Sequence, residues 1–197
     1  MTLDFNSLLR LAWDSVRTPR DAARLVMQVG LPRGARWEAL LLVVLVSVIL
    51  GQITTYVMLG QPGVIFGPFL ANPVLAGVVQ MSLMVIMVFA VFWIGRAMGG
   101  IGAFEDAILL IAWMQFVMIC VQVVQFAALM VLPAMASLVG LAGFALFFWL
   151  LTNFIAELHG FSSLGKVFVM ILVSMMGVAF GLSILLSIVG VTIPGAP

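Results

Sequence analysis

Very little charge follows residue 38 of this chain: the remaining 159 residues carry five charged side chains, against ten in the first 38. Charged residues make up 8% of the whole sequence, whereas an ordinary soluble domain has about 25%. Runs of about 20 apolar residues recur in the charge-poor part, each long enough to cross a hydrocarbon core about 30 Å thick. Lipid offers the backbone no hydrogen bonds, so such runs must be helical. These patterns exclude a water-soluble monomer and predict an all-α, polytopic membrane helical bundle.

We expect five transmembrane helices separated by short connections. Residues 60–73 are rich in Gly and Pro and carry no charge, which is typical of a loop. At the Leu132-Pro133 turn, two full spans or a bent, re-entrant pair both fit the sequence. The predicted spans are residues 39–59, 74–95, 107–131, 134–156 and 167–190. The expected division of the chain is a cytoplasmic segment at 1–38, a helical domain at 39–190 and a short outer tail at 191–197.

The distribution of basic residues predicts the orientation of these spans. All eight Lys and Arg side chains lie in the N-terminal segment or in the connections at 96–106 and 157–166, which five spans place on one side of the membrane. Positive charge is retained on the cytoplasmic side. We therefore expect a cytoplasmic N-terminus and an outer C-terminus. The first apolar run begins at Ala39, later than in a secretory signal peptide, so we expect the first span to direct insertion.

Two short amphipathic helices are predicted before the first span. At 100° per residue, the first (residues 3–17) has an apolar face from which Leu3 and Leu11 are off-register. The second starts at Thr18, the expected cap, with Pro19 at the first helical position. The first face holds Phe5, Leu8, Leu9, Ala12, Trp13 and Val16, and the second holds Ala22, Leu25, Val26 and Val29.

These helices combine basic polar faces with aromatic apolar faces, which suits the cytoplasmic headgroup layer. The alternative is docking on the cytoplasmic ends of the chain's own spans, and the two are compatible. The candidate lipid-surface residues are Phe5, Arg10, Trp13, Arg17, Arg20 and Arg24.

The charged residues after residue 38 fall in predicted loops or at span ends. Together with the single histidine they form a candidate cytoplasmic rim of Arg96, Glu105, Asp106, Glu157, His159 and Lys166. Intramembrane enzymes, pumps and proton-coupled carriers keep ionisable residues at depth, and the spans predicted here keep none. Solvated loop charges are the ordinary interpretation, and Glu105 and Asp106 also suit the start of a helix. The alternative is an acidic metal cluster of Glu105, Asp106, Glu157 and His159.

No sequence motif indicates catalysis, a cofactor or nucleic-acid binding. The glycine cluster at 99–102 lacks the strand and the lysine of a phosphate loop, so we interpret it as a flexible turn. A single cysteine, Cys120, allows no intramolecular disulfide and no cysteine-based zinc cluster. The net charge of +1 argues against nucleic acid as a partner. We expect no cofactor and no enzymatic activity.

Uncharged polar side chains within the spans are expected to face the interior of the bundle. The candidates are Gln80, Gln115, Gln122, Gln125 and Asn153. Interhelical hydrogen bonds, at about 0.5–2 kcal/mol each, are the leading explanation. The alternative is a polar path for a small solute, lined by the four glutamines.

Small residues spaced by four predict close helix contacts. Gly177 and Gly181 give the fifth span a Gly-x-x-x-Gly spacing, and Ala136 and Gly140 repeat the interval in the fourth. We favour packing within the chain for these residues, with a dimer face as the alternative.

Three short motifs lie near the predicted membrane boundaries. They are Gly99-Gly100-Ile101-Gly102-Ala103-Phe104-Glu105-Asp106-Ala107, then His159-Gly160-Phe161-Ser162, and Ala12-Trp13 followed by Pro19-Arg20-Asp21-Ala22-Ala23. These motifs and the five-span pattern resemble the Yip family, whose eukaryotic members were named for interacting with Ypt/Rab GTPases. The eukaryotic branch has an Asp-Leu-Tyr-Gly-Pro-type signature and a Gly-Tyr pair, where this chain has residues 32–38 and Ala112-Trp113. The resemblance therefore implies a bacterial member, which would lie in the inner membrane.

The resemblance also implies a function without catalysis. We expect an integral membrane protein that acts through membrane association, membrane shaping or scaffolding of partner proteins. The expected partners are membrane lipids, with a second copy of the chain or other membrane proteins as further candidates. Two alternatives stay open: a small-solute or lipid transporter lined by glutamines, and a metal-dependent enzyme at the cytoplasmic interface.

Overall fold

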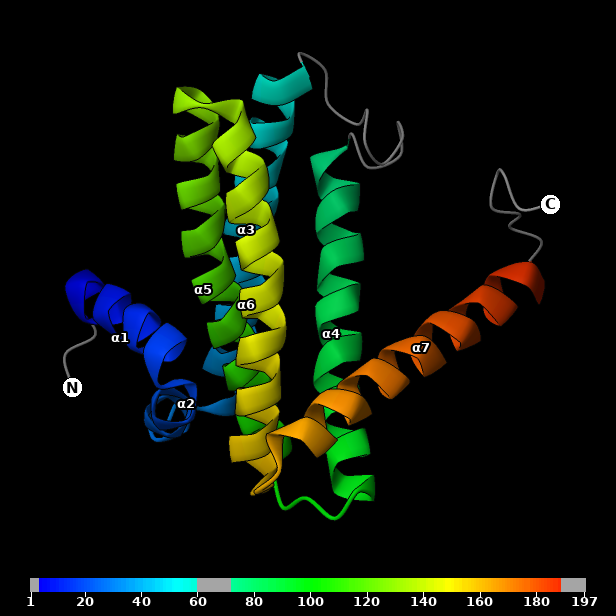
Figure 1. The fold of residues 1–197 in the computed structure, drawn as a ribbon. Helices are drawn as coiled ribbons and strands as arrows, with labels where there is room; N and C mark the ends of the chain where they lie inside the picture. The colour runs from blue at the N-terminus through cyan, green and yellow to red at the C-terminus, as the bar shows by residue number, and fades with distance from the viewer. Residues whose placement is uncertain (1–3, 60–71, 189–197) are drawn as a thin grey trace.

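The computed structural model describes residues 4–59 and 72–188, and the regular structure within these ranges is helical. The helices are α1 (Phe5–Arg17), α2 (Pro19–Met27), α3 (Arg33–Leu59), α4 (Pro73–Ala97), α5 (Phe104–Val131), α6 (Pro133–His159) and α7 (Leu164–Ile188). The last five are long and apolar enough to cross a membrane. The predicted all-α bundle, with two short helices before five spans, is confirmed (Figure 1). Leu3, most of the predicted 60–73 loop, the end of the fifth span and the tail lie outside the described residues.

Two full-length helices meet at the Leu132-Pro133 turn, so the re-entrant alternative is wrong. α5 ends at Val131 and α6 begins at Pro133, with an extended Leu132 between them. Pro133 occupies the first helical position, where its missing N–H costs no helical hydrogen bond. The two helices, of 28 and 27 residues, are each about 40 Å long. They lie side by side and antiparallel (Figure 1).

The centre of the bundle is α5. It contacts α3, α4 and α6, and also the two short helices. Nine consecutive residues, Ala107 to Gln115, are buried around its whole circumference. A helix that is apolar all round is typically buried all round, and α5 satisfies this rule along its first half.

The two short helices dock on the side of this bundle instead of lying free of it. From α1, the side chains of Leu11, Ala12 and Ser15 are buried, and α2 buries Ala22, Ala23 and Val26. Leu11 is therefore buried although it lies off the predicted apolar face. The buried stripe of α1 is displaced from its most apolar face, on which Phe5 and Trp13 stay exposed.

Two further details of these helices differ from the predictions. Leu25, expected on the apolar face of α2, is exposed. Thr18 sits at the start of α2, but its side chain does not cap that helix; its Oγ1 donates to the Asp14 carbonyl oxygen 3.2 Å away. Thr18 thus closes the end of α1 and fixes the bend between the two helices.

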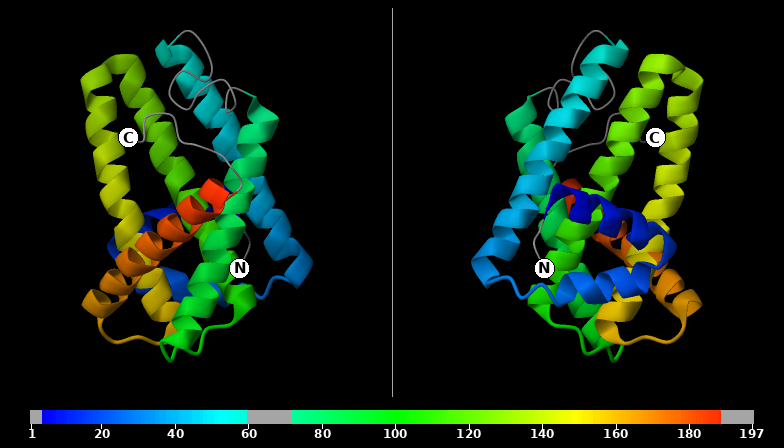
Figure 2. Two further views of the ribbon diagram at one scale, coloured as in Figure 1. Left: turned by 90° about the vertical axis from the view of Figure 1, so that its right-hand side faces the viewer. Right: turned by 90° about the vertical axis from the view of Figure 1, so that its left-hand side faces the viewer.

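The last helix, α7, diverges from the bundle. It contacts α6 near its own start, where Val167 and Ile171 are buried, and then runs obliquely away from the other spans (Figures 1 and 2). Its start lies at what we call the charged end of the bundle, where the α4–α5 and α6–α7 connections come together beside α2 (Figure 1).

Candidate functional site

Three ion pairs join the N-terminal part of the chain to the charged end of the bundle. Arg33 pairs with Glu105, Arg36 with Asp106 at 2.8 Å, and Arg24 with Glu157 at 2.8 Å. Arg36 also donates from its Nε to the carbonyl oxygen of Leu31 at 2.8 Å. The acidic rim residues are therefore partners of arginines 70 or more positions away in the sequence, and not simply solvated loop charges.

This arrangement does not assemble the alternative metal cluster. Each carboxylate of the proposed set, Glu105, Asp106 and Glu157, has its own arginine. Within the described residues, no three His, Cys, Asp or Glu side chains lie close enough to hold a metal ion. The fourth proposed ligand, His159, is 2% exposed and faces the interior of the bundle.

Both ring nitrogens of His159 are engaged in hydrogen bonds. Nδ1 accepts from the backbone N–H of Gly102 at 3.3 Å, so Nε2 carries the proton and donates to the Val91 carbonyl oxygen at 3.0 Å. The ring stacks on Phe161, with 5.6 Å between centroids. This neutral histidine ties the end of α6 to the end of α4 and to the connection that follows α4.

Three glycines make room for the His159 ring. A Cβ atom built on Gly95 or Gly100 would lie 2.2 or 2.4 Å from a ring nitrogen, and one on Gly102 would lie 2.7 Å from Leu158 and 2.9 Å from the ring. The sequence interpretation of residues 99–102 as a flexible turn is wrong in this respect, because the turn packs against a buried side chain. The sequence contained a signal for this site in the spacing of Gly95, Gly100 and Gly102, but its partner lies more than 50 residues away.

The other two rim residues are not paired with carboxylates in the described structure. The guanidinium of Arg96 lies 5.9 Å from the centroid of the Phe92 ring, a cation–π contact. Lys166 is exposed at the start of α7, beside Ser162 and Ser163.

Hydrogen bonds from two tryptophans attach α1 to the bundle at a distance from its charged end. Trp113 Nε1 of α5 donates to Ser15 Oγ at 2.9 Å, and Ser15 in turn donates to the Leu11 carbonyl oxygen at 2.8 Å. Trp149 Nε1 of α6 donates to the Val16 carbonyl oxygen at 3.3 Å. The N-terminal helices thus dock on the chain's own spans, but α1 contacts the side of α5 and α6 and not the span ends that the docking alternative named.

The candidate lipid-surface residues separate into two groups. Arg20 donates to the Phe161 carbonyl oxygen at 2.8 Å and Arg24 binds Glu157, so both face the bundle. Phe5 and Trp13 are 68% and 62% exposed. Arg10 and Arg17 are also exposed, and the Arg17 guanidinium lies 5.9 Å from the Trp13 ring centroid.

A second polar cluster lies inside the spans and centres on Ser47 of α3. Its hydroxyl accepts from Gln115 Nε2 at 2.9 Å and from Gln80 Nε2 at 3.2 Å, and donates to Gln122 Oε1 at 3.4 Å. A hydroxyl has one hydrogen and two lone pairs, so this set uses its full capacity. Ser47 was missed by the sequence analysis. The cluster joins α3, α4 and α5.

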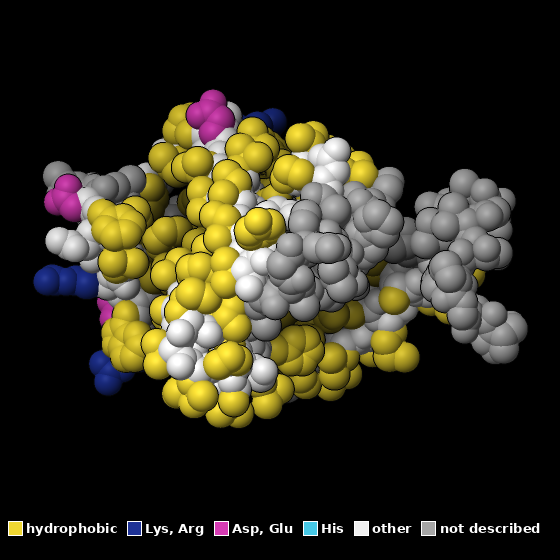
Figure 3. Space-filling view, turned by 90° about the horizontal axis from the view of Figure 1, so that it is seen from above, with side chains coloured by type: hydrophobic (Ala, Val, Ile, Leu, Met, Phe, Trp, Pro, Cys, Tyr) yellow, Lys and Arg dark blue, Asp and Glu magenta, His cyan; other side chains and the backbone are white. Residues whose placement is uncertain are grey.

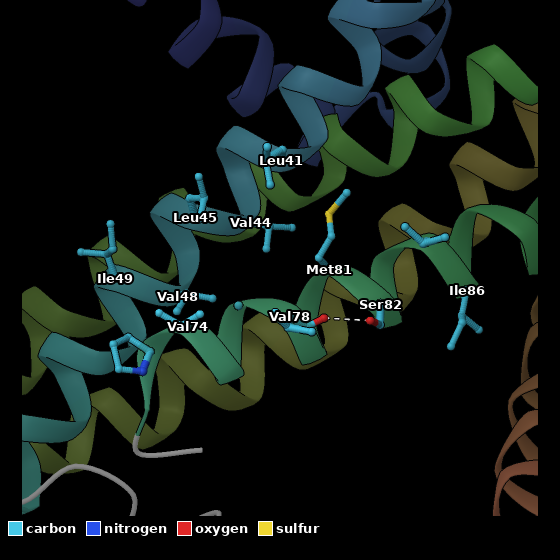
Figure 4. Close-up of a pocket in the computed structure, with 13 residues that line it drawn as sticks. Leu41, Val44, Leu45, Val48, Ile49, Val74, Val78, Met81, Ser82 and Ile86 are labelled. Carbon is cyan, nitrogen blue, oxygen red and sulfur yellow. Dashed lines mark hydrogen bonds between the residues drawn. The ribbon is translucent and has the colours of Figure 1, made fainter. Parts of the chain in front are cut away.

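The remaining interior candidates do not extend this cluster into a path. Gln125 Nε2 donates to the Ala136 carbonyl oxygen at 3.2 Å, and Asn153 Nδ2 donates within its own helix to Trp149 at 2.8 Å. A cavity of about 750 Å³ lies between α3 and α4 and is lined by none of these residues. Its walls are apolar, and the hydroxyl of Ser82 is turned to the Val78 carbonyl oxygen (Figure 4). This cavity therefore does not supply the glutamine-lined channel of the transporter alternative.

The small residues spaced by four make a close helix contact in α6 but not in α7. A Cβ on Gly140 of α6 would lie 2.8 Å from Gln125 Nε2, so α5 and α6 do approach closely there. At Gly177 and Gly181 of α7, no atom of the described residues lies within 4 Å of such a Cβ. The expected tight packing of α7 within the chain is absent from the described structure.

The comparisons with known proteins agree with the architecture. The family model of the Yip1 domain matches residues 13–185, from the middle of α1 to the last turns of α7. No curated protein and no solved structure matches the chain.

Proposed function

The chain belongs to the Yip1 domain family, and we propose that it acts without catalysis, by shaping the membrane through its docked N-terminal helices. The supporting observation is the position of α1 and α2, which are held against the bundle while Phe5 and Trp13 of α1 stay exposed. The family supports a membrane protein; the docked helices support the more specific role.

The depth of α1 carries the argument. Trp113 lies nine residues into α5, about 14 Å along its axis from the charged end. Amphipathic helices at a membrane surface bury their apolar face about 5–10 Å into the boundary between headgroups and acyl chains. α5 is about 40 Å long and the hydrocarbon core is about 30 Å thick, so part of α5 extends beyond the core at the charged end. The contact with Trp113 therefore places the end of α1 at about the depth of a surface-bound amphipathic helix. The two helices therefore add volume to one leaflet only.

We place the charged end in the cytoplasm of a bacterial cell, with the protein in the inner membrane. Six of the eight basic residues lie within residues 1–38, Arg96 lies in the last turn of α4 and Lys166 in the first turn of α7, at that end of the bundle. Viewed from the opposite end, charged side chains of both signs appear at the left and top edges of the molecule, and hydrophobic side chains cover most of the described surface (Figure 3). Reporter fusions at the two termini test the placement, since a periplasm-dependent reporter should be active only at the C-terminus.

The test of membrane shaping uses two tryptophans that are equally exposed. Trp13 on α1 and Trp93 on α4 are both 62% exposed. In liposomes that contain the full-length protein, the Trp13→Ala and Phe5→Ala double variant should reduce tubulation severalfold, because α1 loses its two large exposed aromatic side chains. Trp93→Ala should leave tubulation unchanged. Equal tubulation by all three proteins would contradict the proposal.

A specific observation favours scaffolding as a second function. The exposed apolar face of α7 includes Gly177 and Gly181, whose spacing lets two helices approach closely. We propose that α7 associates with a second copy of the chain or with another membrane protein. Cross-linking in native membranes should lose a specific product in the Gly177→Leu and Gly181→Leu double variant. Gly165→Leu is the matched control, because no described atom lies within 4 Å of a Cβ there either.

A further inference from the structure

A groove of about 360 Å³ lies where α1 crosses the α5–α6 pair. The crossing is visible from the side on which α1 lies (Figure 2, right). Its walls come from three helices and are almost wholly apolar. Among the lining residues are Leu9 and Trp13 of α1, Val117 and Cys120 of α5, and Ala142 and Leu146 of α6.

The groove has the properties of a site for one hydrocarbon chain. Its volume falls within the range of about 300–1,000 Å³ that is common for ligand pockets. It begins near the hydrogen bond from Trp113 to Ser15 and extends along α5 toward Val124, deeper into the membrane. An open surface of α5 and α6 would exchange lipid freely, whereas α1 covers this groove and partly encloses whatever lies in it.

Two arginines of α1, Arg10 and Arg17, lie close along the helix to Trp13, which lines the groove, and Arg17 makes a cation–π contact with the Trp13 ring. Of the six arginines before residue 38, four bind carboxylates or a carbonyl oxygen of the bundle. Arg10 and Arg17 make no ion pair and no hydrogen bond within the described structure, although Asp14 lies between them in sequence. At 100° per residue, Arg10 and Arg17 flank Trp13 along one stripe of α1. Positive charge thus lies beside the apolar groove.

From this arrangement we infer that the groove binds one anionic phospholipid, with an acyl chain between α1 and the α5–α6 pair and the phosphate at Arg10 and Arg17. The groove supplies the apolar contact and the arginines supply charge complementarity. The inference rests on the proposed placement of α1 in the cytoplasmic leaflet and specifies the lipid that α1 recognises there.

Native mass spectrometry of the full-length protein in mild detergent tests the site, with phosphatidylglycerol or phosphatidylcholine added. We expect one retained phosphatidylglycerol and at least about fivefold less phosphatidylcholine, a difference of about 1 kcal/mol. Ala142→Phe fills the groove and should abolish retention. Ala145→Phe is the control, because Ala145 is exposed on the same helix and does not line the groove. Val139→Phe, also in the groove wall, replaces Ala142→Phe if that variant does not fold.

The charge requirement has its own variants. The Arg10→Gln and Arg17→Gln double variant should lower phosphatidylglycerol retention to the phosphatidylcholine level, and the matched double lysine variant should keep most of it. Unchanged retention in Ala142→Phe overturns the site, and so does equal retention of the two lipids. Loss of a dimer mass in Ala142→Phe, without loss of lipid, would also overturn it by showing that a second copy fills the groove.

The liposome assay separates this inference from membrane shaping. If the Ala142→Phe protein tubulates liposomes but retains no lipid, membrane shaping by the N-terminal helices is supported and the lipid site is placed in the groove. Wild-type protein that retains one phosphatidylglycerol but does not tubulate liposomes would keep the lipid site and remove the proposed function.

Discussion

α5 and α7 have similar length and are both apolar enough to cross a membrane, yet they are packed in opposite ways. In α5, nine consecutive residues are buried, whereas α7 buries Val167 and Ile171 and exposes most of its other described residues. Apolar character is thus not what holds a helix to its neighbours in a membrane, since lipid tails are as apolar as leucine.

Specific polar and close contacts account for the difference. α5 offers Gln115 and Gln122 to Ser47 of α3 and Trp113 to α1. On α7, the hydroxyl of Ser174 donates to the Met170 carbonyl oxygen of its own helix at 2.7 Å. None of the ion pairs among the described residues involves α7. Helix α7 is therefore free to present an apolar face to lipid or to another protein.

A large effect is expected when the same small substitution is placed in the two regions. Gly95→Ala puts a methyl group 2.2 Å from His159 Nε2, and we expect overpacking to lower the free energy of unfolding by about 3 kcal/mol. Gly177→Ala in α7 meets no described atom and should be neutral or stabilising by up to about 1 kcal/mol, as alanine favours helix. Unfolding of both variants in SDS titrations measures the difference.

A second variant identifies the cause of the Gly95→Ala effect. In a His159→Ala background the ring that the new methyl group meets is gone, so Gly95→Ala should then cost much less. An equally large loss in that background would show that His159 is not the obstacle.

Removal of the Ser47 hydroxyl tests the polar contacts of α5. Ser47→Ala leaves the amides of Gln80 and Gln115 without their shared partner, and we expect a loss of about 1–2 kcal/mol in the free energy of unfolding. Ser174→Ala is the control in α7 and should cost less than about 0.5 kcal/mol, since its bond joins no second helix. Equal losses in the two variants would contradict the explanation given for α5.

The sequence predicted the helices well because their signals are local. Apolar runs, the Gly- and Pro-rich loop and Pro133 predicted the number of spans and most of their described bounds within three residues. The exception is α3, which begins at Arg33 and not at residue 39 as predicted. The buried faces of the helices were harder to predict than the helices themselves. Leu11 was excluded from the apolar face of α1 because that prediction assumed one apolar environment, whereas α1 lies between the bundle and an outward surface.

The candidate sites were predicted in part, and the missing parts depend on distant partners. The rim residues Glu105 and Glu157 were named, but their arginines were not assigned to them because 72 and 133 positions separate the pairs. Ser47 has no sequence signal of its own and gains its role from three glutamines on two other helices. The spacing of Gly177 and Gly181 permits a close contact but does not specify which helix provides it.

Ion pairs are the third difference between the regions, with a smaller expected effect. A double-mutant cycle with Arg36→Gln and Asp106→Asn should give a coupling of about 1 kcal/mol, at the upper end for pairs near a surface, because the Arg36 side chain is 12% exposed. The Arg24–Glu157 pair, whose arginine is 56% exposed, should give less. Raising the salt from about 0.1 M to about 1 M shortens the Debye length from about 10 Å to about 3 Å and should weaken the second coupling more. A larger coupling for Arg24–Glu157 would contradict this order.

The smallest effect is expected on α7 itself. Phe180 is 71% exposed, so Phe180→Ala removes a side chain that contacts little of the described protein. We expect a change of less than about 0.5 kcal/mol in the free energy of unfolding. Phe154→Ala, at a residue that is 3% exposed in α6, shows that the measurement is sensitive, with an expected loss of about 3–5 kcal/mol. A loss above about 1 kcal/mol for Phe180→Ala in dilute detergent would show that α7 packs against the rest of its own chain, and the contrast between α5 and α7 would then fail.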